Sequence, residues 1–245
     1  MTNKDRTSYF LSAAIIIVAA AVVPAIDVYG RKNRIQGPAC ILDDLRLNSM
    51  TIDRPEDAYR VWKQKGYRGR IVVALGRRLN FVQRDEALSG GAASFPVKVP
   101  DLVRTSEQGL RSNNYLLVAM QTGIARKVVS VVPNDVLQEK MATARSTEGA
   151  STSAGRIDAP YFGSPRAITA LQFLRAPDEP VLLYINASFF RDHEPEDVLA
   201  QLGRIGIRTD LVVLCRSLDD DDVTESQRER LRRFGEMLGG GRGTN

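Results

Sequence analysis

The fold is decided by three segments near the C-terminus: Val181-Leu-Leu-Tyr-Ile185, Pro195-Glu-Asp-Val-Leu-Ala-Gln-Leu-Gly-Arg-Ile205 and Asp210-Leu-Val-Val-Leu-Cys215. The first and third are short apolar runs, which is typical of strands buried on both faces, and the second has a helical pattern opened by proline. A last helix is expected over Thr224–Leu238, because Thr224-Glu-Ser-Gln227 fits a capping box. The order strand, helix, strand, helix predicts a sheet covered by helices.

The same alternation extends toward the N-terminus. Asp53 is expected to cap a helix that begins at Pro55 and ends at Gly66. Four further elements are expected: strands at Arg70–Leu75, Tyr115–Met120 and Lys127–Val132, and a helix from Val136 to about Ala144. The sequence thus predicts a single three-layer α/β domain with a mostly parallel sheet, preceded by a transmembrane or signal helix.

The expected organisation has an N-terminal signal anchor or signal peptide at 1–30, a linker at 31–38, the domain at 39–238 and a disordered tail at 239–245. Within the domain, 146–158 is expected to be an exposed flexible loop, because it is rich in small residues and poor in hydrophobic ones.

The N-terminal segment predicts a membrane partner. Residues 7–26 contain no charged residue, and about 20 residues in a helix cover the ~30 Å hydrocarbon layer. Small residues before Ile26 also suit cleavage near Ala25. Two locations therefore stay open: a single-pass inner-membrane protein with its domain outside the cytoplasm, or an exported periplasmic protein.

The composition of the sequence limits the possible partners, disulfides and cofactors. The 34 basic and 29 acidic residues give a net charge of +5 with no basic block, which argues against nucleic acid. Of the two cysteines, Cys40 and Cys215 could form a disulfide in an oxidising compartment, or Cys215 could be a buried free thiol. No cofactor motif is present, so none is implied.

Ligands of open α/β sheets bind at the carboxyl ends of strands, which directs attention to 76–80, 186–193 and 216–222. His193 could act as an acid or base, or stand solvated beside a helix start that Asp192 caps. Arg77 and Arg78 could bind an anion or be surface arginines. A run of carboxylates could hold a hard cation or form a solvated turn before the next helix: Asp219, Asp220, Asp221 and Asp222.

The stretch 165–238 also resembles the arginase-like superfamily of ureohydrolases and metal-dependent deacetylases. Three features carry the likeness: Ile168-Thr-Ala-Leu171, Leu182-Leu-Tyr-Ile-Asn-Ala-Ser-Phe-Phe190 and Asp210-Leu-Val-Val-Leu-Cys-Arg-Ser217. In that family two aspartates would ligate a metal, and here they are replaced by Asn186 and Ser188. The resemblance therefore implies a three-layer α/β fold with a site that has lost its metal.

The expected function is a binding or interaction module of the cell envelope, with a possible envelope protein partner. The alternative is a degenerate arginase- or deacetylase-like hydrolase acting on an amine, amide or sugar, with a pocket formed by Asn186, Ser188, Asp192, His193 and Arg216. A structural component of an envelope assembly is a third possibility, and it would carry a large exposed apolar patch.

Overall fold

The computed structural model describes residues 40–41, 48–80, 109–145, 149–160 and 165–239. Contacts divide the chain into Met1–Ile35 and Gln36–Asn245, and all described residues belong to the second unit. The predicted membrane segment and linker, together with the tail after Gly239, lie outside these residues. Within the described ranges, no helix combines the length and the apolar character needed to cross a bilayer.

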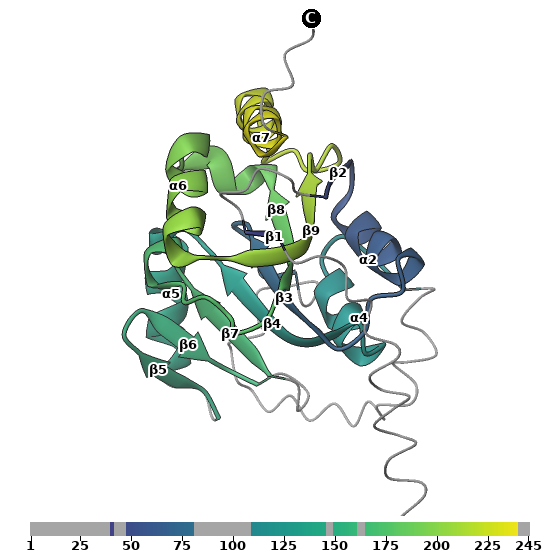
Figure 1. Ribbon diagram of the computed structural model, residues 1–245. Coiled ribbons are helices and arrows are strands. Elements are labelled where there is room, and N and C mark those ends of the chain that lie inside the picture. Colours follow the sequence, from purple (N-terminus) through teal and green to yellow (C-terminus); the bar gives the residue numbers. More distant parts are fainter. Residues whose placement is uncertain (1–39, 42–47, 81–108, 146–148, 161–164, 240–245) are drawn as a thin grey trace, which may run out of the picture. The chain divides into compact units, whose positions relative to one another are not determined.

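The described strands form one sheet in which parallel pairs predominate (Figure 1). The strands are β1 (Cys40–Ile41), β2 (Ser49–Ile52), β3 (Arg70–Leu75), β4 (Ala125–Val131), β5 (Ser151–Ser153), β6 (Arg156–Asp158), β7 (Arg166–Thr169), β8 (Val181–Asn186) and β9 (Arg208–Cys215). Their order is β1-β9-β8-β3-β4-β7-β6-β5, with β2 also paired to β9. The strands from β9 across to β7, and β2, run parallel, whereas β1, β6 and β5 pair antiparallel.

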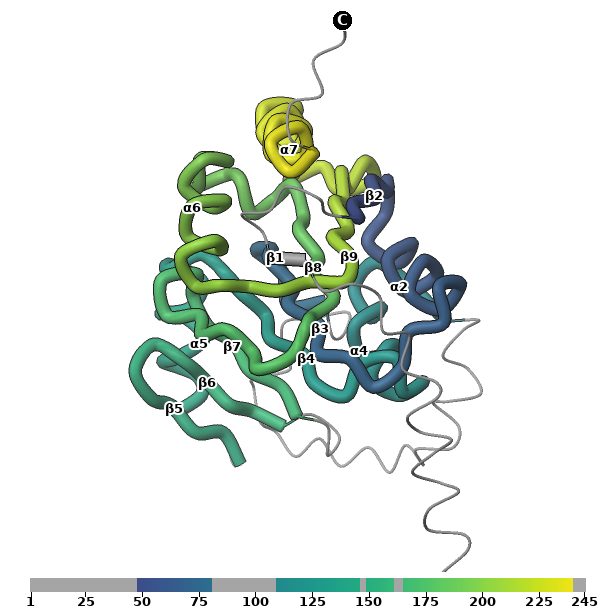
Figure 2. The backbone as a smooth tube through the Cα atoms, viewed as in Figure 1, coloured from purple at the N-terminus to yellow at the C-terminus, as the bar shows by residue number. Residues whose placement is uncertain are grey.

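Helices cover both faces of this sheet. They are α2 (Pro55–Gln64), α4 (Tyr115–Gln121), α5 (Asn134–Ala144), α6 (Pro195–Ile205), α7 (Glu225–Leu238) and the short 3-10 helices η3 (Leu171–Phe173) and η4 (Ala187–Arg191). One core cluster joins buried residues of α2, α4 and α5 to the sheet, and the other joins those of α6 and α7. Figure 2 shows the chain passing from β8 through α6 to β9 and on to α7.

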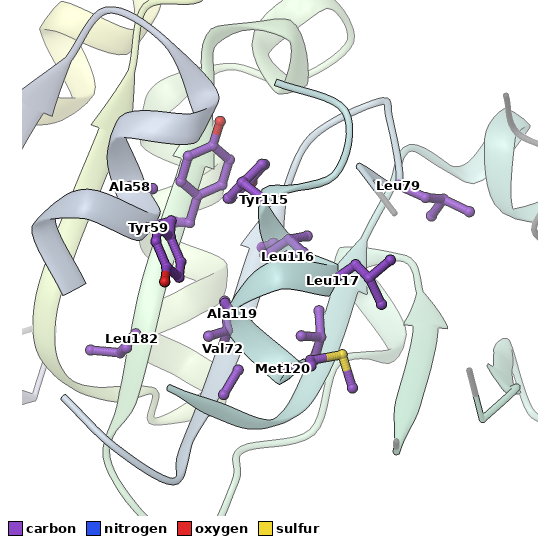
Figure 3. Packing of buried hydrophobic residues seen from close by; sticks show 14 of the residues in the cluster. Ala58, Tyr59, Val72, Leu79, Tyr115, Leu116, Leu117, Ala119, Met120 and Leu182 are labelled. Atoms are coloured by element: carbon purple, nitrogen blue, oxygen red, sulfur yellow. The ribbon is translucent and has the colours of Figure 1, made fainter. Parts of the chain in front are cut away.

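The first core is centred on α4, which is apolar on all sides. It packs between α2 and the sheet, so all six residues from Tyr115 to Met120 are buried. Figure 3 shows Ala58 and Tyr59 of α2 on one side of this helix and Val72 of β3 on the other. A helix without a polar face is stable only when both sides are covered, as they are here.

Most of the predicted helices and strands are confirmed. Strand β3 and helix α6 have the predicted bounds, and β8 and β9 differ from the predictions by one and two residues. The capping box of α7 is also present, with Thr224 accepting a hydrogen bond from the backbone of Gln227. The expected α/β class with a mostly parallel sheet is therefore confirmed.

The predicted strand at Tyr115–Met120 is wrong, because these residues form helix α4. A continuous apolar run has no visible period, so a buried strand and a buried helix look alike in sequence. Leucine, alanine and methionine favour the helix, and the parallel pairing of β3 and β4 requires a crossover between them.

Two local predictions are also wrong. Residues 151–158 are not a loop, because β5 and β6 form a hairpin that extends the sheet beyond β7. The tight turn between the strands contains Ala154 and Gly155, both with positive φ. The N-cap residue of α2 is Arg54, whose side chain makes no capping hydrogen bond, and the carboxylate of Asp53 accepts a hydrogen bond from Arg216.

Candidate functional site

The direction in which the chain adds strands to the sheet reverses between β3 and β8. These strands are neighbours, but the chain continues from β3 to β4 on one side and from β8 to β9 on the other. The connecting helices therefore cover opposite faces, and the loops at the carboxyl ends of β3 and β8 diverge. Such a divergence leaves a crevice, which is the usual ligand position in open α/β sheets.

A cavity of about 370 Å³ opens at this point. All three loops indicated by the sequence contribute to it, together with the start of α2 and the segment before α4. Its lining residues are Pro55, Glu56, Gly76, Arg78, Asn80, Leu110, Arg111, Ser112, Asn113, Asn186, Ser188, Ser217, Asp219 and Asp220. Polar side chains predominate in this set, and none of these residues is aromatic.

Two of the lining loops contain a residue in the left-handed region of backbone space. Asn80 has a φ of 55° and Ser217 a φ of 49°. Such conformations are uncommon for residues other than glycine and persist only where the surroundings hold them. Next to them, a Cβ on Gly76 would lie 3.4 Å from the Cβ of Asn186, so the first loop approaches β8 closely.

Asn186 holds the base of the cavity together. Its Nδ2 donates to the hydroxyl of Tyr184 at 2.9 Å and to that of Ser217 at 2.7 Å, and its Oδ1 accepts from the backbone of Ser188 at 2.9 Å. The Ser188 hydroxyl in turn accepts from the backbone of Arg77 at 3.3 Å. The loops after β3, β8 and β9 are thus joined through two side chains, Asn186 and Ser188.

Cys215 lies beneath this network as a buried free thiol, 3.5 Å from the hydroxyl of Ser217. Burial is the main cause that raises the pKa of Cys215. Cys215 therefore does not form the disulfide with Cys40 that the sequence left open. Cys40 pairs with Thr209, which is roughly 20 Å along the strand from Cys215, whereas a disulfide needs Cα atoms within about 7 Å.

Three carboxylates line the cavity in different electrostatic settings. Asp219 pairs with Arg54 at 2.8 Å, and Asp220 pairs with Arg78 at 3.1 Å. Glu56 is 9% exposed and accepts a hydrogen bond from the hydroxyl of Ser112 at 2.8 Å. Within the described ranges, no cation lies within ion-pair distance of Glu56.

Some residues predicted for the pocket lie elsewhere. Arg216 is exposed and pairs with Asp53, and Asp192 pairs with Arg77, which also contacts Asp135 at 2.7 Å. Of the acidic run, Asp221 is exposed and lies outside the cavity lining. Asp222, also outside it, pairs with Arg78 at 2.6 Å.

These partners replace the free anion site predicted for Arg77 and Arg78, because both guanidinium groups already bind carboxylates of the chain.

His193 also lies outside the cavity lining. Its ring packs on Phe189 with 4.4 Å between ring centroids, and its Nε2 is buried without a hydrogen-bond partner. Burial is the main cause that lowers the pKa of His193, and Asp192 and Asp197 oppose this shift. The imidazole is therefore held mainly in its neutral form.

A pH dependence follows from this setting. Because the pKa of His193 is lower in the folded than in the unfolded chain, its contribution to stability is present above about pH 6.5 and is lost as the pH falls through the folded value. Chemical denaturation at pH 7.5 and 5.5 should show a smaller loss of stability on acidification for His193→Gln than for the wild type. An equal loss in both proteins would contradict this assignment.

The lining does not fit a divalent metal. Asn186 already uses its oxygen for the backbone of Ser188. Across the described parts of the chain, no three side chains of histidine, cysteine, aspartate or glutamate are close enough to share an ion. Asn186 and Ser188 therefore act here as hydrogen-bonding residues of the cavity base.

Sequence reasoning missed the start of α2 and the segment before α4, which contribute Pro55, Glu56, Leu110, Arg111, Ser112 and Asn113 to the lining. In the sequence, Glu56 is an acidic residue in the first turn of a helix, where acids are common, so it gave no sign of a ligand site. The segment before α4 carries no recognisable motif. Comparison of the chain with protein-family models, with curated proteins and with solved structures finds no match in any of the three.

Proposed function

We propose that this chain is a small-ligand-binding α/β module of the cell envelope, held at the membrane by residues 7–26 or exported after their removal. The observation that carries the proposal is the polar cavity at the divergence of β3 and β8. Its volume falls within the range of small-molecule sites, about 300 to 1,000 Å³. The left-handed Asn80 and Ser217 support it, because conformations of this kind concentrate at ligand sites.

Binding at this cavity can be tested with a filled variant. Full-length protein in a mild detergent is screened against a library of small polar compounds by thermal shift, and the hits are remeasured by calorimetry. In Ser112→Phe a ring occupies the cavity, so the hits should bind at least about tenfold more weakly, because a filled site loses shape complementarity. The matched control is Ser151→Phe on the exposed strand β5, which should leave binding unchanged.

The absence of any hit, or equal affinity in Ser112→Phe and the wild type, would contradict the binding proposal. The envelope location has its own test. Cells producing the full-length chain should retain it in the membrane fraction or in the periplasm, and a chain lacking residues 1–30 should remain in the cytosol.

A second candidate function is hydrolysis by a degenerate arginase- or deacetylase-like site. It is favoured by the presence of Asn186 and Ser188 in the lining of one cavity. Turnover of a panel of amides, esters and acetylated amines, measured with and without added divalent cations, distinguishes the two functions. Turnover that Ser112→Phe abolishes and Ser151→Phe does not would replace the binding module with the hydrolase.

A further inference from the structure

The buried charge of Glu56 distinguishes one side of the cavity. This carboxylate lies in the first turn of α2, where the helix dipole favours an anion, and the hydroxyl of Ser112 satisfies one of its oxygens. Asp219 and Asp220 have arginine partners, whereas Glu56 has no cationic partner within the described ranges. A buried carboxylate without a countercharge is unfavourable, so an incoming cation would gain a strong charge-assisted contact.

The hydrogen-bonding groups of the lining point to the same kind of ligand. The Oδ1 of Asn113 is buried and has no hydrogen-bond partner. In contrast, both Nδ2 hydrogens of Asn186 are donated within the protein, and Arg78 binds Asp220 and Asp222. Other donors of the lining remain, among them the exposed Arg111 and the side-chain amide of Asn113. What the cavity offers to an incoming donor is the carboxylate of Glu56 and the unpartnered Oδ1 of Asn113.

We propose that the ligand is a small primary ammonium or guanidinium compound whose charged group binds Glu56 and donates a hydrogen bond to Asn113. This inference rests on the proposed binding function. It excludes quaternary ammonium ligands, which have no N–H to donate and are usually bound by aromatic faces. Among the described residues, none that lines the cavity is aromatic.

The experiment compares small probes that differ in charge and in hydrogen-bonding groups. Calorimetric titration of the full-length protein in a mild detergent uses n-butylamine, n-butylguanidine, n-butanol, butyrate and tetramethylammonium. The amine and the guanidine should bind at least about tenfold more tightly than the alcohol, because hydrogen bonds to charged groups contribute more than neutral ones. Butyrate and tetramethylammonium should not bind measurably.

Two variants assign the contact. Glu56→Gln retains the size of the side chain and an acceptor for Ser112 but removes the charge, so amine binding should weaken at least about tenfold. Asn113→Ala removes the unused acceptor and should weaken amine binding several-fold. The control is Asp221→Asn, the same change of charge at an exposed position outside the lining, which should leave the affinity unchanged.

Thermal unfolding of each variant confirms that it is folded before titration, and Asn113→Ala tests the contact independently should Glu56→Gln fail to fold. Equal binding of the amine and the alcohol, or amine binding that neither Glu56→Gln nor Asn113→Ala weakens, would overturn the cation proposal. In that case neutral or anionic library hits that Ser112→Phe abolishes would leave the binding function standing. If no compound of any charge binds, both proposals fail.

Discussion

Replacing Asp210 with alanine should lower the free energy of unfolding by about 3 to 5 kcal/mol, because it removes one partner of the buried ion pair between Arg70 and Asp210. Arg70 begins β3 and Asp210 lies in β9, and their side chains are 11% and 1% exposed. Removing one partner of a buried ion pair costs far more than the pair contributes, since the remaining charge stays desolvated. Urea denaturation monitored by circular dichroism measures the change.

Two control proteins separate the ion pair from general damage. The double variant Arg70→Met with Asp210→Leu removes both charges and should recover most of the lost stability. Glu229→Ala breaks an ion pair with Arg232 in which both side chains are 58% exposed, and it should leave stability nearly unchanged because solvent screens the pair. If the double variant is as unstable as Asp210→Ala, the loss of the ion-pair partner is not the cause of the destabilisation.

Phe234→Ala should destabilise the protein by about 3 to 5 kcal/mol, because it removes a fully buried ring from the core between α7 and the sheet. The ring of Phe234 lies 5.6 Å from that of Phe190 in η4, so the substitution also loosens the turn that follows β8. The same denaturation measurement, at a fixed temperature, gives the size of the loss.

Phe173→Ala is the matched control, since it deletes the same atoms from a side chain that is 40% exposed. The cost there should be smaller, about 1 to 2 kcal/mol, because part of the ring is already in water and no enclosed void remains. Similar losses for the two phenylalanines would contradict the assignment of Phe234 to a closed core.

The elements that could be predicted from the sequence are those with strong local signals. Helix α6 begins at a proline and ends at Gly206, which has a φ of 77°, and α7 begins with a complete capping box. Strand β3 is a short apolar run between two glycines, Gly69 and Gly76. In each case the residues that begin or end the element are its immediate neighbours, so no tertiary information was needed.

The elements that could not be predicted depend on partners distant in sequence. Helix α4 could not be recognised from its own sequence, because its apolar run has no helical period. The run is explained by the packing of α4 between α2 and the sheet. The hairpin of β5 and β6 is stabilised by the pairing of β6 with β7. Its small polar residues have low strand propensity, so they did not predict this pairing.

The site was predictable at the level of loops and unpredictable at the level of residues. Topology alone indicated the three strand ends that line the cavity. Glu56 looked like an ordinary acid at a helix start, and only its burial beside Ser112 makes it a candidate ligand residue. His193, the one histidine of the sequence, lies against Phe189 outside the cavity.

The separation of the cavity wall from the strands has a consequence for the descent of this protein. The described wall is built from residues that follow β3, β8 and β9, begin α2 or precede α4, and of its residues only Asn186 belongs to a parallel strand pair. Exchanging the side chains at Ser112, Asn113 or Asp219 would therefore alter ligand choice at little cost in folding. Selection could diversify recognition in relatives, and protein engineers could do the same, while the scaffold beneath is inherited intact.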